Sequence, residues 1–489
     1  MEKEKGYKIH SVKYNLIMNV ILKMSSFIFP LITFPYVSRV LGAVGNGKVS
    51  FATSVIYYFT MIATLGIPTY GVKICAQHRD NKEKLSKTVK ELLAIESIAM
   101  LLSYLIFFVA LFAIPRLQEE RTLMLINSAT ILLTVFGVEW FYQAIEQYDY
   151  ITFRNLAFKV LSIVLMFLLV HKTEDYILYG AITVIGTVGS NVLNIIRLRK
   201  LVDLKTKAKL ELSRHIRPIM MLFMLSASTM IYTSLDTTML GFIKGDADVG
   251  YYNAAIKLKN ILVSLVTSLG TVLLPRLSNS LANQDMALFN RLIKKSFDFA
   301  LLLSIPLTAY CILEANDCIT FLAGAGYEPA ILPMQFISPA IIFIGLSNII
   351  GIQILIPLGK ENLTVISTIV GAIVNVILNS ILIPAYSAAG AALATTIAEL
   401  SVVIVQLYFI KDHMISMIDI KNYMKILFAC IISTVILAIN NMTIHIDSSF
   451  ITIIETGILY FAIYGLLLLI MKENIVKEIT SNLKSRLIK

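Results

Sequence analysis

The chain has 489 residues, of which 57% are hydrophobic and 15% are charged, and its mean hydropathy is +0.78. This composition excludes an ordinary water-soluble protein and indicates a polytopic membrane protein. The net charge of +11 does not indicate a nucleic-acid partner, because Lys and Arg gather in short gaps on one side of the apolar runs, as the positive-inside rule requires.

Apolar runs of about twenty residues, each long enough to cross a bilayer, follow one another along the whole chain. The first set covers approximately 14–40, 49–72, 91–114, 122–143, 154–170 and 177–196. The second set covers approximately 217–242, 251–275, 296–316, 330–357, 364–383, 388–409, 424–440 and 451–471. The sequence therefore predicts an all-α membrane fold of about fourteen transmembrane helices.

A strongly basic segment, Arg197 to Arg217, separates the two sets and holds only Asp203 and Glu211 as acids. Segments of this kind stay in the cytoplasm during insertion, and an even number of spans then places the N- and C-termini there too. The charged N-terminus leads into a full apolar span without a small-residue cleavage site, so we expect no removable signal peptide.

The predicted domains are an N-terminal six-helix bundle (1–196), a basic cytoplasmic linker (197–217), a C-terminal six-helix bundle (218–410), and two extra helices with a cytoplasmic tail (411–489). A weak repeat supports this division, because a Leu-Gly pair and a later glycine precede both the second and the eighth runs (Gly47 and Gly250). The bundles are expected to be pseudo-symmetric about an axis along the membrane normal, as in transporters.

Polar side chains form a narrow stripe on the eighth predicted helix, at Asn253, Lys257, Asn260, Ser264 and Ser268. Their spacing of three or four residues places them on one face, which suggests a wet cavity. Lys259 points to another side.

The seventh helix has a matching face that ends at Asp236, at about the depth of Lys257 in an antiparallel hairpin. Two readings stay open: Asp236 and Lys257 neutralise each other, or Lys257 is free to hold an anion.

The first predicted helix carries another polar face, with Asn15, Asn19, Lys23 and Ser26, followed by Pro30 and Pro35, which permit bending. Lys23 is a candidate substrate-binding residue because an ammonium group inside a membrane needs a partner. Arg39 is a second candidate, although it can simply extend to the outer interface.

Polar residues in the second set of helices suggest an ion-coupling site. Asn375 and Asn379 share one helix face, Thr395 and Glu399 share another, and Glu399 falls near mid-membrane without a nearby base in the sequence. Glu399 is either a protonatable or cation-binding group or a protonated packing residue. Asn348 and Gln353 are candidate neighbours, and Asp236 is grouped with this site.

Motifs of soluble catalysis are absent from the sequence: there is no phosphate loop, no HExxH, and no paired-cysteine motif. Cys75, Cys311, Cys318 and Cys430 are scattered and are expected to be core residues. We expect no metal, no cofactor and no enzymatic activity.

Two stretches resemble bacterial polysaccharide flippases, the O-antigen or repeat-unit transporters of the multidrug/oligosaccharidyl-lipid/polysaccharide flippase superfamily: ITFPYVSRVLGAVGNGKVSFA (residues 32–52) and VEWFYQAIEQYDYITFRN (residues 138–155). A third, IPAYSAAGAALATTIAEL (residues 383–400), looks like the same family's helix eleven to twelve region. The residues that carry the family pattern are Glu139, Trp140, Gln143, Glu146, Tyr150 and Arg154. Ala144 stands where the family usually has glycine, and residues 43–46 replace its usual proline and acid.

The resemblance implies a V-shaped pair of bundles in the bacterial cytoplasmic membrane that moves a lipid-linked oligosaccharide from the inner to the outer leaflet. Such a protein serves surface polysaccharide biosynthesis, of O-antigen or capsule, beside glycosyltransferases and a glycan polymerase. Coupling to H⁺ or Na⁺ would drive export. Two alternatives remain open at this point: a cation-coupled multidrug exporter of the same superfamily, and a membrane glycan polymerase or ligase.

Overall fold

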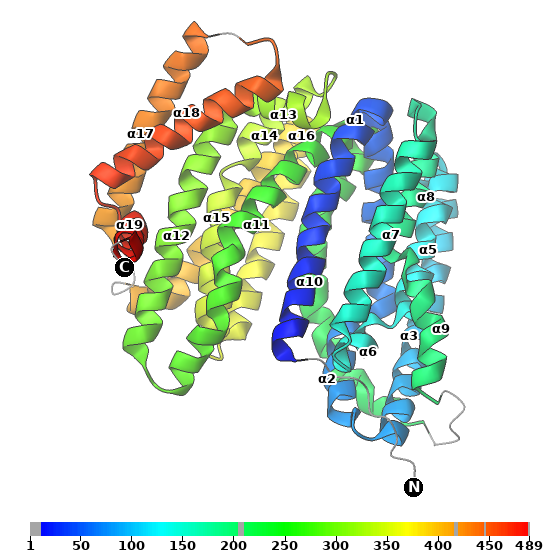
Figure 1. Cartoon of the computed structure of the whole chain (residues 1–489). Coiled ribbons are helices and arrows are strands. Elements are labelled where there is room, and N and C mark those ends of the chain that lie inside the picture. The colour runs from blue at the N-terminus through cyan, green and yellow to red at the C-terminus, as the bar shows by residue number, and fades with distance from the viewer. Residues whose placement is uncertain (1–10, 204–209, 415–418, 445, 488–489) are drawn as a thin grey trace. The chain divides into compact units, whose positions relative to one another are not determined.

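The computed structural model describes residues 11–203, 210–414, 419–444 and 446–487, and these residues form helices and turns without a strand (Figure 1). Eleven helical stretches in this part of the chain are long and apolar enough to cross a membrane. The prediction of an all-helical membrane protein is therefore confirmed. Two of the eleven stretches contain a sharp reversal, and the total of fourteen spans stays a prediction.

The chain divides into two compact units, Met1–Gly250 and Tyr251–Lys489. The helices of the first unit are α1 (Val12–Thr64), α2 (Ile67–His78), α3 (Lys82–Ala113), α4 (Pro115–Gln118), α5 (Arg121–Gly137), α6 (Glu139–Ala144), α7 (Tyr148–Leu169), η1 (Thr173–Asp175), α8 (Tyr176–Val184), the π-helix η2 (Ile185–Gly189), α9 (Asn191–Leu201) and α10 (Ser213–Ile243).

The second unit begins within α11 (Asp246–Ala282). It continues with α12 (Met286–Leu313), α13 (Ala315–Ala323), η3 (Glu328–Ala330), α14 (Ile331–Ile337), α15 (Ala340–Asn348), the π-helix η4 (Ile349–Leu355), α16 (Glu361–Met414), α17 (Ile420–Thr443), α18 (Ser449–Ile470) and α19 (Asn474–Leu487). The predicted C-terminal tail is thus partly a helix of its own, α19.

The boundary between the units lies later than the predicted linker at 197–217. The described part of that segment is mostly helical, since α9 extends to Leu201 and α10 begins at Ser213, and residues 204–209 lie outside the described residues. Helix α10 packs on α1 and α2 and belongs to the first unit, whereas the sequence assigned it to the second bundle. The pseudo-symmetric pair of six-helix bundles stays a prediction.

Helix α1 reverses at a single residue, Gly42, whose φ of 64° is in the region that favours glycine. A Cβ atom on Gly45 would lie 2.9 Å from the Cβ of Leu41, whereas residues four apart in a continuous helix have Cβ atoms about 5–6 Å apart. The break lies within the gap at residues 40–49 that the sequence predicted between the first two spans, but it is one residue and not a loop. Pro30 and Pro35, which permit bending, lie inside the first arm of the helix.

Helix α16 reverses in the same way at Ser387, with φ 50° and ψ −131°. A Cβ atom on Gly390 would lie 2.2 Å from the backbone oxygen of Leu382, although eight residues of continuous helix rise about 12 Å. The two arms of α16 therefore double back on each other. This places the predicted eleventh and twelfth helices side by side.

Candidate functional site

The family motif forms the junction of α5, α6 and α7. Val138 has a left-handed backbone (φ 39°), which ends α5 and starts α6 at Glu139. The guanidinium of Arg154 is buried and donates to the Glu139 carboxylate (3.3 Å) and to Oδ1 of Asn191 on α9 (2.6 Å). The motif pair Glu139 and Arg154, predicted from the resemblance, is thus in contact and fastens α6 and α7 to α9.

The other motif residues bind further helices to this junction. The indole of Trp140 donates to the buried carboxylate of Glu96 on α3 (3.3 Å), and its ring lies so close to α2 that a Cβ on Gly71 would be 2.7 Å away. Glu146 accepts from Arg79 after α2 (2.5 Å) and from Asn15 on α1 (3.4 Å). Gln143 is half-buried on α6. These contacts give the motif a positioning role.

A lysine that the sequence analysis missed lies in the same unit, near the middle of α7. The ammonium of Lys159 donates to the hydroxyls of Ser25 (2.8 Å) and Ser26 (3.0 Å) on α1. No described carboxylate lies within 4.0 Å of it, and Glu139 already binds Arg154. The Lys159 ammonium therefore binds neutral hydroxyls and no described carboxylate.

The first-helix candidates differ in how they are engaged. Lys23, one turn before Ser26 and Phe27, is exposed and makes no hydrogen bond or ion pair with a described residue. Arg39 is also exposed, and its guanidinium donates to the carbonyl oxygen of Pro35 (2.6 Å). Lys159 therefore contacts the polar stripe of α1, and Lys23 belongs to that stripe without a described ion-pair partner, whereas Arg39 is partly satisfied by its own helix.

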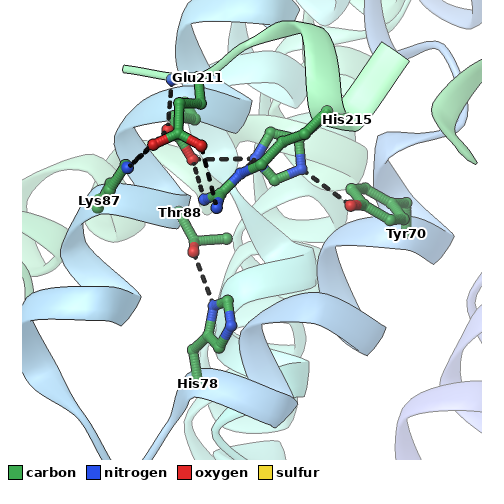
Figure 2. Close-up of polar contacts among 8 residues, drawn as sticks. Tyr70, His78, Lys87, Thr88, Glu211 and His215 are labelled. Carbon is green, nitrogen blue, oxygen red and sulfur yellow. Dashed lines mark hydrogen bonds and ion pairs between the residues drawn. The ribbon is translucent and has the colours of Figure 1, made fainter. Parts of the chain in front are cut away.

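A buried ionic network joins the start of α10 to α3 (Figure 2). Glu91 is completely buried, and its carboxylate contacts Arg214 (2.6 Å) and the Nε2 atom of His215 (2.9 Å), while accepting from the backbone N–H of Glu211 (2.7 Å). Tyr70 on α2 contacts the other ring nitrogen of His215 (2.8 Å). The network attaches the C-terminal part of the predicted linker, which includes Glu211 and Arg214, to α3 of the first unit.

Arg116 on α4 makes a second set of polar contacts, at the C-terminal end of α10. Its guanidinium binds Asp246 and Glu119 and donates to the carbonyl oxygen of Gly241 (3.0 Å). Nearby, a Cβ on Gly47 would lie 1.7 Å from the carbonyl oxygen of Asp246. Helix α10, which carries the buried candidate Asp236, is thus held at both ends.

The candidates on α11 lie in the second unit. Lys257 is half-buried and makes no hydrogen bond or ion pair with another described residue, whereas Lys259 is 8% exposed and is engaged by a neighbour. Asn253 is half-buried and Asn260 is exposed. Asp236 belongs to the first unit and Lys257 to the second, so their mutual neutralisation stays a prediction.

The ion-coupling candidates lie on the two arms of α16. Asn375 and Asn379 are fully buried on the first arm and share a hydrogen bond of 3.0 Å. Glu399 is buried on the second arm, and it and Asn375 stand twelve positions to either side of Ser387. Equal spacing in a reversed helix puts the two side chains at the same depth.

The second arm of α16 contacts the start of α11. Tyr252 and Thr395 share a buried hydrogen bond (2.9 Å), and farther along the same two helices Leu277 and Ile410 belong to one hydrophobic cluster. The helices are therefore parallel. Lys259 lies two turns beyond Tyr252, and Glu399 lies one turn beyond Thr395, so both charges are on the facing sides of their helices.

Gln353, predicted as a neighbour of Glu399, belongs to a separate polar cluster. It accepts from the hydroxyl of Ser296 on α12 (2.7 Å), and its amide lies 2.4 Å from where a Cβ on Gly270 would be. Asn348 lies against the same glycine. This cluster joins α11, α12 and η4, and it lies in the π-helical turn, a feature that often marks functional sites.

Comparison with known proteins fits this arrangement. A family model described as polysaccharide biosynthesis protein matches residues 12–281, more than half of the chain. The chain belongs to this family. The matched segment includes the whole junction around Glu139 and Arg154, and the flippase family that the motifs resembled is confirmed.

The relatives of this polysaccharide biosynthesis protein include transporters. An Escherichia coli (strain K12) protein named as an O-antigen transporter is 26% identical over 353 residues, which cover 71% of this chain and 84% of the relative. A Shigella dysenteriae protein with the same name is 23% identical over 409 residues, covering 82% of this chain and 100% of the relative. The prediction that the chain is not an enzyme is confirmed by these relatives.

Solved structures share the fold. The lipid II flippase MurJ, in an inward closed conformation, matches with a TM-score of 0.75 and 17% identity over 93% of this chain and 99% of that chain. An inward-facing multidrug resistance MATE family transporter matches with a TM-score of 0.60 and 12% identity, over 82% of this chain and 98% of that chain. At these identities the likeness shows the fold alone.

Proposed function

We propose that the protein is a flippase that moves polyprenyl-pyrophosphate-linked oligosaccharide units from the inner to the outer leaflet of the bacterial cytoplasmic membrane. Its product would feed the assembly of a surface polysaccharide, O-antigen or capsule. The proposal is supported by the family, by the O-antigen transporters among its relatives, and by the flippase among the structures that share its fold.

The observation that carries the proposal is the pair of unneutralised ammonium groups, Lys23 and Lys159. Each lies in a membrane-crossing stretch, and neither has a carboxylate partner among the described residues. An unpaired charge in a membrane is costly, and such residues usually mark a substrate path. Lys159 beside the hydroxyls of Ser25 and Ser26, with Lys23 on the same stretch of α1, suits an anion that also accepts hydrogen bonds, such as a pyrophosphate.

The rest of the substrate fits the polar faces described above. A sugar presents hydroxyl groups, which the amides and hydroxyls on α11, including Asn253 and Asn260, can bind by donating and accepting hydrogen bonds. The polyprenyl tail would stay in the lipid, because hydrocarbon gains nothing from leaving it. Lys257, a lysine of the second unit without a described hydrogen-bond or ion-pair partner, is a further residue that we assign to substrate binding.

Directed transport needs a source of energy. We place ion coupling at Glu399, because entry of one H⁺ or Na⁺ with the membrane potential provides about 2.3 kcal/mol per 100 mV. Asn375 at the same depth, with Asn379 beside it, would orient the carboxylate. Alternating access by rocking of the two units would expose the site to one leaflet at a time.

The test is export of lipid-linked glycan in a bacterial strain that lacks this gene. Lys159→Ala and Lys23→Ala should each abolish or strongly reduce export while the protein still inserts, and Lys159→Arg should retain most of it because the charge remains. Lys257→Ala should behave like Lys159→Ala. Lys360→Ala, which removes an exposed lysine in the turn before α16, is the control. Normal export by both Lys159→Ala and Lys23→Ala would contradict the proposal.

The rival function is a cation-coupled multidrug exporter, because a MATE transporter shares the fold. Three acids of the first unit, Glu139, Glu146 and Glu91, are each engaged by a base, whereas Lys159 has no described carboxylate partner, and this balance favours an anionic over a cationic substrate. Drug resistance that survives Lys159→Glu, together with unchanged glycan export, would favour the rival. A glycan polymerase, the enzyme alternative, is opposed by the transporter relatives.

A further inference from the structure

The last helix, α19, has a different orientation from the spans before it. It follows α18 after only three residues, Met471 to Glu473, so it begins within about 10 Å of the end of a membrane span. Figure 1 shows α19 nearly end-on, whereas α12 and α17 run lengthwise beside it. Its axis therefore lies across the spans, in the direction of the membrane plane.

Side-chain contacts hold the beginning of α19 in this direction. Glu473 is fully buried and accepts from the backbone N–H groups of Ile475 and Val476 (both 2.9 Å) and from Asn422 on α17 (2.7 Å). Asn474 donates to Asp298 on α12 (3.3 Å) and to Asp419 (3.2 Å). The first turn of α19 is thus a fixed part of the second unit.

Helix α19 is amphipathic, and its apolar stripe extends beyond the helices that support it. Apolar residues stand at positions 475, 476 and 479, a spacing that places them along one side. Ile475 is 9% exposed against Ile426 and Leu468, but Ile479, one turn later, is 52% exposed. The bundle therefore covers only the start of the stripe.

The charge of the same segment is strongly positive. Residues 472–489 contain five basic residues and two acids. Both acids are already engaged, because Glu473 binds Asn422 and Glu478 pairs with Lys295 on α12 (2.6 Å). Lys477 remains exposed beside the apolar stripe. A helix with an apolar side and basic flanks binds membrane surfaces that carry anionic lipids.

We propose that α19 lies in the plane of the membrane surface, with Ile479 at the boundary of the acyl chains and Lys477 among anionic lipid headgroups. The occupant of the exposed stripe is the same bilayer that α18 crosses, three residues away. In this position α19 would hold the two additional helices, α17 and α18, at a set depth. The inference does not depend on the transported substrate.

The test places a spin label on the full-length protein in lipid nanodiscs. Ile479→Cys reports the apolar stripe, and Ser481→Cys, two positions later on the opposite side of the helix, is the matched control. The four native cysteines are buried and are replaced in both variants. With phosphatidylglycerol present, the label at 479 should collide several-fold more with oxygen than with a water-soluble nickel reagent, and the label at 481 should show the reverse.

A charge-reversal variant separates lipid from other partners. Lys477→Glu, or nanodiscs of phosphatidylcholine alone, should reduce the preference of the 479 label for oxygen. A label at 479 that is as open to nickel as the label at 481 in every lipid would overturn the proposal. Protection of 479 in detergent, dependent on protein concentration, would assign the stripe to a second copy of the chain instead. None of these spin-label measurements depends on glycan export, so the test of α19 is independent of the proposed function.

Discussion

Glu91 and Arg214 form an ion pair of 2.6 Å that joins α3 to the first turn of α10. The carboxylate is fully buried, while the guanidinium side chain is 41% exposed. The two ends of the pair are therefore not equivalent. Glu91 must satisfy its oxygen atoms within the protein, and it does so with His215 and with the N–H of Glu211 as well (Figure 2).

We expect Glu91→Ala to destabilise the protein more than Arg214→Ala. Loss of the carboxylate leaves His215 and a backbone N–H without their partner, and breaking a buried pair in this way costs about 3–5 kcal/mol. Loss of the exposed arginine should cost about 1 kcal/mol or less. Thermal unfolding of the detergent-purified variants measures both. Equal effects, or a larger loss for Arg214→Ala, would show that Glu91 is not the centre of the network.

Arg154 should not tolerate replacement by lysine. Its guanidinium binds Glu139 and Asn191 at once, and an ammonium cannot reproduce this planar geometry. Arg154→Lys and Arg154→Ala should both lower the unfolding temperature and the amount of protein in the membrane, with a cost of several kcal/mol for the alanine variant. Arg199→Ala, a change at an exposed base near the end of α9, should have little effect. Full rescue by lysine would show that charge alone is needed.

Gly47→Ala should be strongly destabilising, since the added Cβ would meet the carbonyl oxygen of Asp246 at 1.7 Å. A backbone oxygen cannot move away as the end of a flexible side chain can. We therefore expect the free energy of unfolding to fall by about 1–3 kcal/mol or more. Gly465→Ala is the matched control. A Cβ there would meet nothing within 4 Å, and alanine in a helix is about 0.5–1 kcal/mol more favourable than glycine. Opposite shifts of the unfolding temperature are expected from the two variants.

The pair of Lys294 and Asp419 predicts a pH dependence of stability. The hydrogen bond from the Lys294 ammonium (2.8 Å) lowers the pKa of Asp419 below its ordinary value, with a further contribution from the N–H of Asn422. Because the pKa of Asp419 is lower in the folded state, its ionised carboxylate stabilises the protein at pH values above the unfolded pKa of about 3.9. This stabilisation is lost as the pH falls through the folded pKa. Because both side chains are partly exposed, the effect should be below about 1 kcal/mol.

The corresponding measurement is thermal unfolding between pH 7 and pH 3 for the unaltered protein and Asp419→Asn. The asparagine variant should be slightly less stable at pH 7 and should lose less stability between pH 5 and pH 3. Parallel curves would exclude a contribution from this pair.

Glu399→Gln should uncouple export from the ion gradient. The carboxylate is buried, and the neutral amide keeps its shape but cannot take up a proton or bind a cation as strongly. The expected result in vesicles is export that no longer responds to an imposed H⁺ or Na⁺ gradient. Asn379→Asp, on the facing arm, tests whether a carboxylate can act from there. An unchanged gradient response in Glu399→Gln would remove Glu399 from the mechanism.

Sequence reasoning found the parts of the fold that depend on local pattern. Apolar length predicts membrane helices, and the spacing of Asn375, Asn379, Thr395 and Glu399 correctly places each pair on one helix face, because periodicity is a property of neighbouring residues. Family resemblance identified Glu139 and Arg154 as motif residues, but it did not predict their contact. Its geometry also requires Asn191, which is 37 residues farther along.

The parts that sequence reasoning missed depend on distant contacts. Lys159 lies inside an apolar run, and its role becomes visible only when Ser25 and Ser26, more than 130 residues earlier, come beside it. Glu91 was not singled out from the sequence, because its partners Arg214 and His215 lie more than 120 residues later in the chain. The reversal at Ser387 falls between the predicted spans 364–383 and 388–409, but the sequence did not show that a single residue other than glycine makes it.

The reversals at Gly42 and Ser387 have a practical consequence for studying this protein. Each reversal joins two long helical arms through one non-helical residue. An epitope or a protease site inserted at either reversal would therefore separate the two arms. The turn that ends with Gly359 and Lys360, by contrast, is exposed and has open space around its glycine. Antibody tags and reporter fusions should be accepted there.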